Sequence, residues 1–324
     1  MSEFRYNKLT RKWVLFSPNR AKRPVEVCQQ DKSVQTENLE SCPFETGREH
    51  MTPDELLRIG DKDHWRVRVV PNLYHALSID DELISHKYQS FEVKSGFGAH
   101  EVIIETPDHT KQMYHFTLDE FVDYFTAIKL RIENLKKDTR LQYFSLFKNC
   151  GNNAGATLDH SHTQLIAMPF IPNKIKEDLE FYRKHKEETQ RDFFDDLIYD
   201  EQRFKKGLLF ENNSFIAFCP YASTFPFEVL VVAQEPICSI IECESVQIYA
   251  LSEIMEFLFK NLHKALGEFS FNLLIKNGDM NHPDNPNRLH LQILPRLTGV
   301  AGFELESDIF INTILPELAA KVLK

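Results

Sequence analysis

Apolar positions repeat one order of elements twice along the chain: strand, strand, long helix, strand, strand. The runs that predict strands are rich in β-branched and aromatic residues and are bounded by Pro, Gly and Asn. They cover 65–72, 99–105, 144–149 and 162–169 in the first half, and 215–221, 227–232, 271–277 and 290–296 in the second. The shared order indicates an internal duplication.

Each half also predicts one long amphipathic helix. Thr117 and Glu120 form a capping-box pattern at the start of the first helix. The apolar residues at helical spacing are Phe121, Phe125, Ile128, Ile132 and Leu135 in the first half, and Ile248, Leu251, Met255, Leu258 and Leu262 in the second. Together these elements predict an α+β fold of duplicated units, in which antiparallel sheets pack under one helix each.

Three regions follow from this pattern. Residues 1–172 form the first half and residues 208–324 the second. The stretch between them, 173–207, is highly charged, which predicts an inserted, solvated amphipathic helix.

Composition narrows the class of protein. The chain has 324 residues, 42% apolar and 27% charged, as in globular proteins, and its net charge of -10 argues against a general nucleic-acid binder. No apolar run reaches the roughly 18 residues of a membrane span, and the N-terminus shows no signal-peptide core. The six cysteines are scattered, so we expect a cytoplasmic protein with reduced thiols.

The run ATLDHSHTQLIAMP (156–169) carries the most chemistry. In an extended strand, His160, His162 and Gln164 project from the same face. The turn before them, from Asn152 to Thr157, can direct backbone N–H groups at an anion. The pattern alone leaves two alternatives open, a catalytic row and an ordinary packed strand.

The segment GATLDHSHTQ resembles the active-site strand of the histidine-triad superfamily. With glutamine at its last position, the segment resembles the nucleotidyltransferase branch of that superfamily, which is the galactose-1-phosphate uridylyltransferase family. The HSH within it also occurs in the related ADP-glucose phosphorylase-like group. Four further segments resemble this family in the right order: 4–24, 68–77, 106–111 and 295–304.

The resemblance implies a mechanism. His162 would attack the α-phosphorus of a nucleoside diphosphate sugar, release sugar 1-phosphate and pass the nucleotide to a second phosphate. We expect a backbone carbonyl near His160 to hold the other imidazole nitrogen. Gln164 would donate a hydrogen bond to a phosphoryl oxygen, and because an amide is not a general acid, transfer would be favoured over hydrolysis.

The resemblance also assigns substrate-binding residues. Arg20 and Arg23 would neutralise the diphosphate. The nucleotide or phosphate contacts would be Asn72, Asn149 and Thr157, and Glu304 would lie near the sugar.

A zinc ion is implied as well, held by Cys42, Glu45, His109 and His160. Glu45 departs from the cysteine usual in the family, but a carboxylate can bind zinc. A second metal site of some relatives falls on Asp178, Arg288 and His290, and we expect it to be lost, because arginine cannot ligate a metal. Of the histidines left without a role, His100 beside the strand EVIIE is the first to be reconsidered.

The leading interpretation is an enzyme that moves UMP, or AMP, between sugar 1-phosphates, as a UDP-glucose:hexose-1-phosphate uridylyltransferase does. The alternative is an ADP-glucose phosphorylase-like enzyme with inorganic phosphate as acceptor. A third possibility, from another class, is a non-catalytic sugar-nucleotide-binding protein, which the departures at Glu45 and Arg288 keep open. Relatives are commonly dimers, so the resemblance implies a homodimer.

Overall fold

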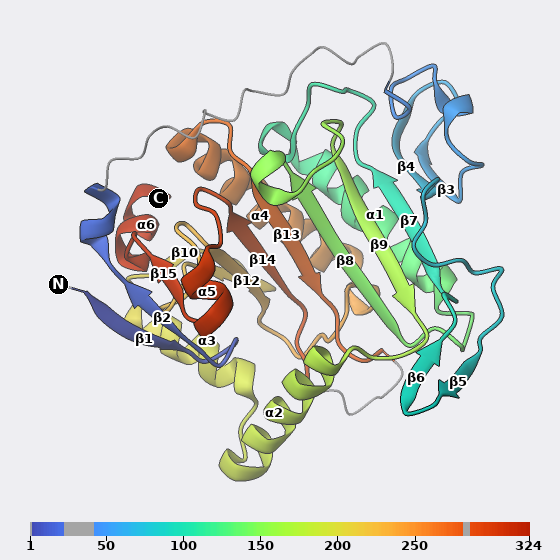
Figure 1. The fold of residues 1–324 in the computed structure, drawn as a ribbon. Helices are drawn as coiled ribbons and strands as arrows, with labels where there is room; N and C mark the ends of the chain where they lie inside the picture. The colour runs from blue at the N-terminus through green and yellow to red at the C-terminus, as the bar shows by residue number, and fades with distance from the viewer. Residues whose placement is uncertain (1, 23–41, 281–285) are drawn as a thin grey trace.

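One ten-stranded antiparallel sheet organises the molecule. The computed structural model of the chain describes residues 2–22, 42–280 and 286–324. In spatial order the strands are β10 (Leu208–Glu211), β11 (Phe215–Phe218), β12 (Val229–Ala233), β14 (His290–Pro295), β13 (Phe271–Lys276), β8 (Tyr143–Cys150), β9 (His162–Met168), β7 (Ala99–Ile104), β4 (Trp65–Pro71) and β3 (Leu57–Gly60) (Figure 1).

The predicted repeat is confirmed, and its two halves share this sheet. All eight predicted strands are present, and the expected helices are α1 (Leu118–Leu135) and α4 (Ser245–Leu266), the first with its Thr117–Glu120 capping box. The halves meet where β8 pairs with β13, from Phe271 opposite Cys150 to Ile275 opposite Leu146. Because this pairing satisfies the backbone groups of two strand edges, the halves form one sheet.

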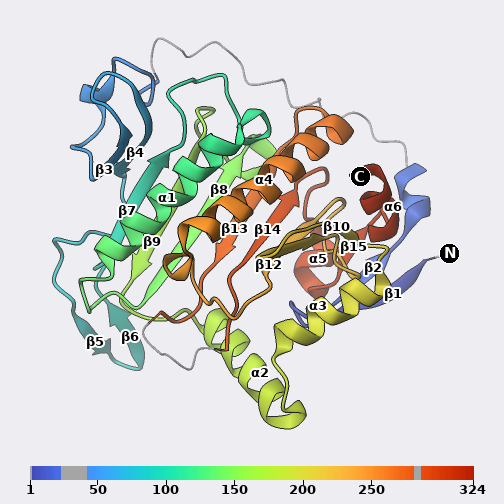
Figure 2. The ribbon, with the colours of Figure 1, turned by 180° about the vertical axis from the view of Figure 1, so that it is seen from behind.

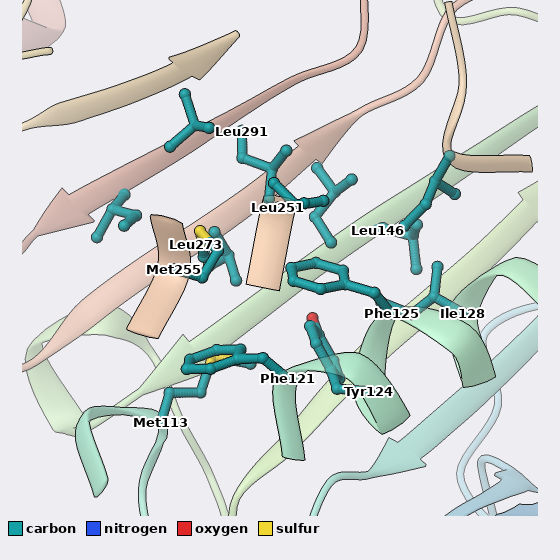
Figure 3. Packing of buried hydrophobic residues seen from close by; sticks show 14 of the residues in the cluster. Met113, Phe121, Tyr124, Phe125, Ile128, Leu146, Leu251, Met255, Leu273 and Leu291 are labelled. Carbon is teal, nitrogen blue, oxygen red and sulfur yellow. The ribbon is translucent and has the colours of Figure 1, made fainter. Parts of the chain in front are cut away.

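Helices α1 and α4 lie side by side on one face of the sheet (Figure 2). Their apolar stripes meet the strands in the main core, where Phe121 and Phe125 of α1 and Met255 of α4 lie close to Leu146 and Leu273 (Figure 3). Each of these side chains is at most 2% exposed, so this layer fixes which face of every strand points inward.

The charged insertion forms two helices, α2 (Asn173–Thr189) and α3 (Phe193–Phe204). Their apolar residues are buried against the second face of β11 and β12, where Phe194 and Tyr182 pack in a cluster with Phe218 and Leu230. One solvated amphipathic helix was predicted here, and the structure has two helices, each with an apolar stripe between its charged residues. The insertion therefore covers the second face of the C-terminal half.

Smaller elements complete the fold. A three-stranded sheet contains β1 (Glu3–Asn7), β2 (Lys12–Phe16) and β15 (Phe310–Asn312), and a separate hairpin contains β5 (Ser85–Tyr88) and β6 (Phe91–Lys94). The remaining elements are η1 (Pro18–Lys22), η3 (Glu49–Met51), η4 (Met113–His115), η5 (Asn152–Ala154), η6 (Ile240–Glu242), α5 (Gly302–Ser307) and α6 (Pro316–Val322). Within the described part of the chain, every helix is too short or too polar to cross a bilayer.

Candidate active site

The histidine strand β9 turns its two functional side chains away from the helix layer. Thr163 faces α1, because its hydroxyl lies 2.9 Å from the Tyr124 hydroxyl of that helix. Neighbouring residues of a strand point to opposite faces, so His162 and Gln164 project from the second face. The insertion packs against that second face at β11 and β12, and its cluster does not include residues of β9.

The His162 ring is held in one orientation. Its Nδ1 donates a hydrogen bond to the backbone carbonyl of His160 at 2.7 Å, as expected from the sequence, and the Phe44 ring packs edge-on with centroids 5.6 Å apart. Burial lowers the pKa of His162, and the nearby Lys148 ammonium lowers it further. With Nδ1 protonated and donating, the neutral ring keeps its lone pair on Nε2, which is the form that a nucleophile needs.

A buried charged network supports the strand from behind. Lys148 on β8 donates to Glu105 at 3.0 Å, to the Ser161 hydroxyl at 2.9 Å and to the carbonyl of His162 at 3.2 Å. The Ser161 and Thr163 hydroxyls also donate to Glu105. The two charged side chains are 1% and 0% exposed, so water cannot replace these bonds. The network fixes the backbone on both sides of His162.

Gln164 is oriented by a neighbour on β7. The backbone N–H of Ala76 donates to His100 Nδ1 at 3.1 Å, which makes that nitrogen an acceptor and places the ring proton on Nε2. Nε2 therefore donates to Gln164 Oε1 at 2.9 Å. With its oxygen occupied, Gln164 must present its NH₂ group in the other direction. The Nδ2 of Asn72 lies 3.2 Å from the same His100 nitrogen, which brings this predicted nucleotide contact to the site.

The turn beside the strand is also constrained. Asn272 on β13 donates to Asn149 Oδ1 at 2.8 Å and to the carbonyl of Ala154 at 3.0 Å, so the amide NH₂ of Asn149 remains to donate to a ligand. Gly151 has φ +79, and a Cβ there would lie 2.2 Å from the Ser270 hydroxyl, so the turn requires glycine. Thr157 lies exposed on the loop that follows.

Three of the four predicted zinc ligands form a compact, buried group. The ligand atoms of Cys42, His109 and His160 all lie within 4.8 Å of one another, with Cys42 Sγ 3.5 Å from His160 Nδ1. His160 Nε2 donates to the carbonyl of Thr106 at 2.7 Å, so its Nδ1 carries the lone pair towards the cysteine. Glu45 Oε2 lies 4.0 Å from His109 Nδ1, beside the group rather than within it.

The unpaired atoms of this group fit a metal ion. Both ring nitrogens of His109 and Oε2 of Glu45 are buried without a hydrogen-bond partner among the described residues. Burial lowers the pKa of His160 to about 4 and raises the pKa of the Cys42 thiol, so His160 is neutral and can offer a lone pair. A cation would satisfy these atoms, since neutral imidazole, thiolate and carboxylate are the ligands that zinc prefers. This group could hold a metal ion.

Three of the predicted substrate-binding residues belong to the segments at the two ends of the chain, namely Arg20, Arg23 and Glu304. Arg20 is exposed in η1, after the small sheet, and Glu304 caps its own helix α5 by accepting from the Ala301 N–H at 3.1 Å. Figure 1 shows α5 beside the small sheet of β1, β2 and β15, to the left of β9 in that view. Arg23 lies outside the described residues. The substrate-binding roles of Arg20 and Glu304 therefore stay predictions.

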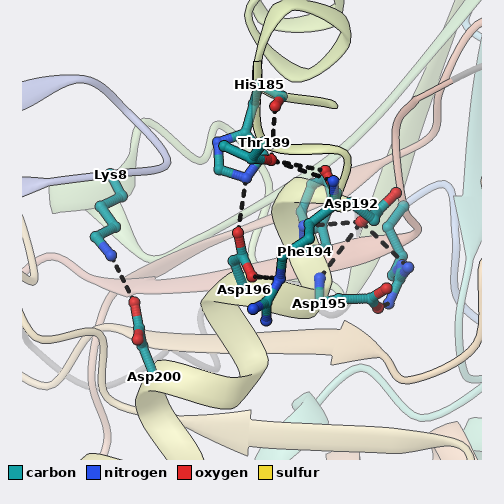
Figure 4. Close-up of polar contacts among 10 residues, drawn as sticks. Lys8, His185, Thr189, Asp192, Phe194, Asp195, Asp196 and Asp200 are labelled. Carbon is teal, nitrogen blue, oxygen red and sulfur yellow. Dashed lines mark hydrogen bonds and ion pairs between the residues drawn. The ribbon is translucent and has the colours of Figure 1, made fainter. Parts of the chain in front are cut away.

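In the second half, His290 makes the same kind of hydrogen bond as His162, but helix α3 packs over its ring. His290 Nδ1 donates to the carbonyl of Arg288 at 2.8 Å, as His162 does to His160, but the Phe194 ring of α3 packs against it with centroids 5.3 Å apart. The Arg288 guanidinium pairs with Asp195 at 2.7 Å and Asp192 at 3.2 Å at the start of α3. Figure 4 shows these aspartates at the junction of the two inserted helices. Arg288 thus holds the insertion in place by an ion pair.

Some residues of the site were missed from the sequence. His100 had been left without a role, and Lys148, Glu105 and Asn272 were not singled out. The apolar runs gave a signal for both residues, because a charge within or directly after an apolar strand, as at Lys148 and Glu105, needs a buried partner. His100 and Asn272 could not be found in this way, since their contacts depend on which strands become neighbours.

Comparisons with known proteins identify relatives that match most of the chain. The family model for the N-terminal domain of galactose-1-phosphate uridyl transferase matches residues 1–172, and a model described as a domain of unknown function (DUF4921) matches residues 97–324. The chain is 32% identical to an ADP-glucose phosphorylase of Arabidopsis thaliana over 99% of its length and 92% of the relative's, and 24% identical to a galactose-1-phosphate uridylyltransferase of Thermotoga maritima over 100% and 98%.

A solved structure gives the same result. The crystal structure of an ADP-glucose phosphorylase from Arabidopsis thaliana with bound ADP-glucose superposes with a TM-score of 0.84 and 30% identity, over 100% of this chain and 98% of that one. The match covers both halves and the insertion between them. This chain therefore belongs to the galactose-1-phosphate uridyl transferase family.

Proposed function

We propose that this protein is a nucleotidyltransferase that moves a nucleoside monophosphate from a nucleoside diphosphate sugar to a second phosphate through a nucleotidyl-His162 intermediate. The observation that carries the proposal is the His162 ring, whose Nδ1 is tied to the carbonyl of His160. Its Nε2 has no hydrogen-bond partner among the described residues and lies on the face that the insertion leaves free. A neutral imidazole fixed in this tautomer is prepared for attack on phosphorus.

The transfer takes two steps. In the first, His162 Nε2 forms a bond to the α-phosphorus while the bond from that phosphorus to the β-phosphate oxygen breaks, which releases sugar 1-phosphate. In the second, an oxygen of the acceptor phosphate attacks the same phosphorus and the N–P bond breaks, which restores the imidazole. Because each step displaces one group in line, the protein supplies mainly position and charge.

Gln164 serves the phosphoryl oxygens in both steps. Since His100 occupies its carbonyl oxygen, the amide NH₂ is free to donate to a non-bridging oxygen as charge develops there. An amide has no proton to give to a leaving group, so water gains no general acid at this position. We infer that this favours transfer to phosphate over hydrolysis.

Adenosine and inorganic phosphate are the proposed nucleotide and acceptor. The support is the higher identity to an ADP-glucose phosphorylase, 32%, than to the Thermotoga maritima uridylyltransferase, 24%. The test is a panel of two donors, ADP-glucose and UDP-glucose, with two acceptors, phosphate and galactose 1-phosphate. ADP-glucose with phosphate should give the highest kcat/KM. Preference for UDP-glucose with galactose 1-phosphate would support a uridylyltransferase, and binding without turnover would support a sugar-nucleotide-binding protein.

His100 is proposed as a positioning residue, and two substitutions separate its contacts. Asparagine imitates Nδ1 and keeps the bond to Ala76, whereas glutamine imitates Nε2 and keeps the bond to Gln164. We expect His100→Asn to slow formation of the nucleotidyl-enzyme about fivefold with little change in substrate Kd, since one hydrogen bond contributes roughly 1 kcal/mol. His100→Gln should keep most of the rate, as measured by single-turnover kinetics.

A double-mutant comparison provides the control. If His100 acts through Gln164, then His100→Asn should have almost no further effect in a Gln164→Ala background. Additive losses in the double variant would show instead that His100 supports the fold independently.

We further propose that the bound metal is a structural zinc ion held by Cys42, His109 and His160, with Glu45 as fourth ligand. When bound, zinc would lock the segment around Cys42 onto the start of β9. His160 joins that metal group to the catalytic strand, because its carbonyl holds the His162 ring. The role assigned to the metal is therefore to orient the strand.

The purified protein should contain about one equivalent of zinc. Cys42→Ser should lose most of it and unfold at a lower temperature, because the binding energy of a structural metal contributes to folding. Glu45→Ala, compared with Glu45→Gln, tests the fourth ligand by the same metal analysis. Zinc well below a tenth of an equivalent in the wild type, with stability unaffected by chelator, would contradict the proposal.

Two sequence predictions remain proposals. None of the five cysteines among the described residues forms a disulfide, which supports a cytoplasmic location. The homodimer that the resemblance implies also stays a proposal, and sedimentation velocity would test it.

A further inference from the structure

A small polar cavity lies on the second face of the C-terminal half, away from His162. It has a volume of about 80 Å³ and lies where α2 and the loop after β1 meet strands β13 and β14. Its polar wall includes Thr10, Asp178, Lys276, Asn277, His290 and Gln292. In strand order β9 and β14 are three spacings apart, roughly 14 Å, so this cavity is distinct from the catalytic centre.

Two polar groups of the cavity wall lack a hydrogen-bond partner among the described residues. The Thr10 hydroxyl and the Asn277 NH₂ group are buried without a hydrogen-bond partner among the described residues, and Asn277 is only 3% exposed. Asn277 Oδ1 already accepts from Ser239 and from the N–H of Ile240, so its amide group is fixed. Buried donors are seldom left unpaired, so these atoms point to a bound group.

The charges of the wall favour an anion. Lys276 lies in register with His290, so both side chains share the covered face. The one carboxylate on the wall, Asp178, is already paired with Arg11 at 2.6 Å and with Lys174 at 2.5 Å. The three cations and one carboxylate of this cluster leave an excess of two positive charges. A metal cation would be repelled, whereas an anion would neutralise Lys276.

Because His290 presents an acceptor nitrogen to the cavity, an anion bound beside it must carry a proton that it can donate. Its Nδ1 donates to the carbonyl of Arg288 at 2.8 Å, and burial lowers its pKa to about 4, so the ring is neutral and its Nε2 is an acceptor. We propose that this cavity binds hydrogen phosphate, whose O–H donates to His290 Nε2 while Lys276, Gln292 and Asn277 donate to its other oxygens. The cavity has room for a small oxyanion, because a buried water needs only about 10–15 Å³ of such cavity volume.

Bound phosphate would connect the insertion to the sheet. The wall joins α2 through Asp178 and Lys174 to strands β13 and β14. Binding to the folded state alone should therefore stabilise the protein, whether or not phosphate also serves as the acceptor at His162.

The test is calorimetric titration of the intact protein with inorganic phosphate at pH 7.5. Because the catalytic centre is expected to bind phosphate as well, Asn149→Ala is used to weaken that centre, and the remaining binding reports the cavity. In this background Lys276→Met should weaken phosphate binding at least tenfold, and Thr10→Val, which is isosteric, should weaken it severalfold. Sulfate, which carries no proton at this pH, should bind about tenfold more weakly than phosphate.

Several outcomes would overturn the proposal. These are equal phosphate binding with and without Lys276→Met or Thr10→Val, equal affinity for sulfate and phosphate, or saturable Mn²⁺ binding that His290→Asn removes. Glucose 1-phosphate distinguishes the source of the phosphate: failure to compete supports free phosphate, and tight competition would contradict a site for a free oxyanion. Circular dichroism and thermal unfolding confirm that each variant is folded. None of these readouts depends on nucleotidyl transfer.

Discussion

His162→Asn is expected to lower the rate of nucleotidyl transfer by roughly four orders of magnitude or more, because it removes the attacking nitrogen. The asparagine amide can still donate to the carbonyl of His160, as Nδ1 does now, so the strand should keep its conformation. The measurement is kcat/KM with ADP-glucose and phosphate, together with the Kd for ADP-glucose. We expect the Kd to change little.

The control is a histidine on a surface element. His86→Asn lies on β5, where every residue is exposed, and should leave transfer unchanged. If His162→Asn retains activity within tenfold of the wild type while His86→Asn behaves normally, then His162 is not the nucleophile and the mechanism proposed above is wrong.

Lys148→Met is expected to have the largest effect on stability. It removes the cation from a buried pair and leaves the Glu105 carboxylate without its charged partner, a change that costs about 3–5 kcal/mol. The hydroxyls of Ser161 and Thr163 remain as donors to Glu105, so the protein should still fold. The measurement is the free energy of unfolding in urea at 25 °C.

A second substitution separates charge from packing. Adding Glu105→Gln to Lys148→Met removes the stranded charge but keeps a group that accepts from the two hydroxyls, so at least half of the lost stability should return. The matched control is Lys260→Met, which removes an ion pair with Glu256 on the exposed side of α4 and should cost under about 1 kcal/mol. Equal effects of Lys148→Met and Lys260→Met would contradict the role given to the buried network.

The repeated strands and helices could be predicted because their periodicity is local. The apolar runs in 99–105 and 162–169 and the capping box at Thr117 need no knowledge of distant neighbours. The pairing of β8 with β13 could not be predicted, since many strand orders satisfy the same pattern. The burial of α3 was missed for a related reason, because the charge of 173–207 conceals the apolar stripe that Phe193, Phe194 and Leu197 form.

In the candidate site, too, the features that depend on one strand could be predicted, and those that depend on strand pairing could not. The orientation of His162 follows from its own strand, so the backbone acceptor near His160 was expected and found. The orientation of Gln164 depends on His100, which reaches it only because β7 pairs with β9 in the observed register. The Glu45 carboxylate lies beside the compact group of Cys42, His109 and His160, so its role as fourth ligand stays a prediction.

The most direct test of the account is intact-mass spectrometry after brief mixing with ADP-glucose in the absence of phosphate. The account predicts a mass gain of one nucleoside monophosphate, mapped by peptide analysis to His162 and not to the covered His290, and lost when phosphate is added. An enzyme that turns over ADP-glucose without any adduct on His162, or with the adduct on another residue, would contradict it.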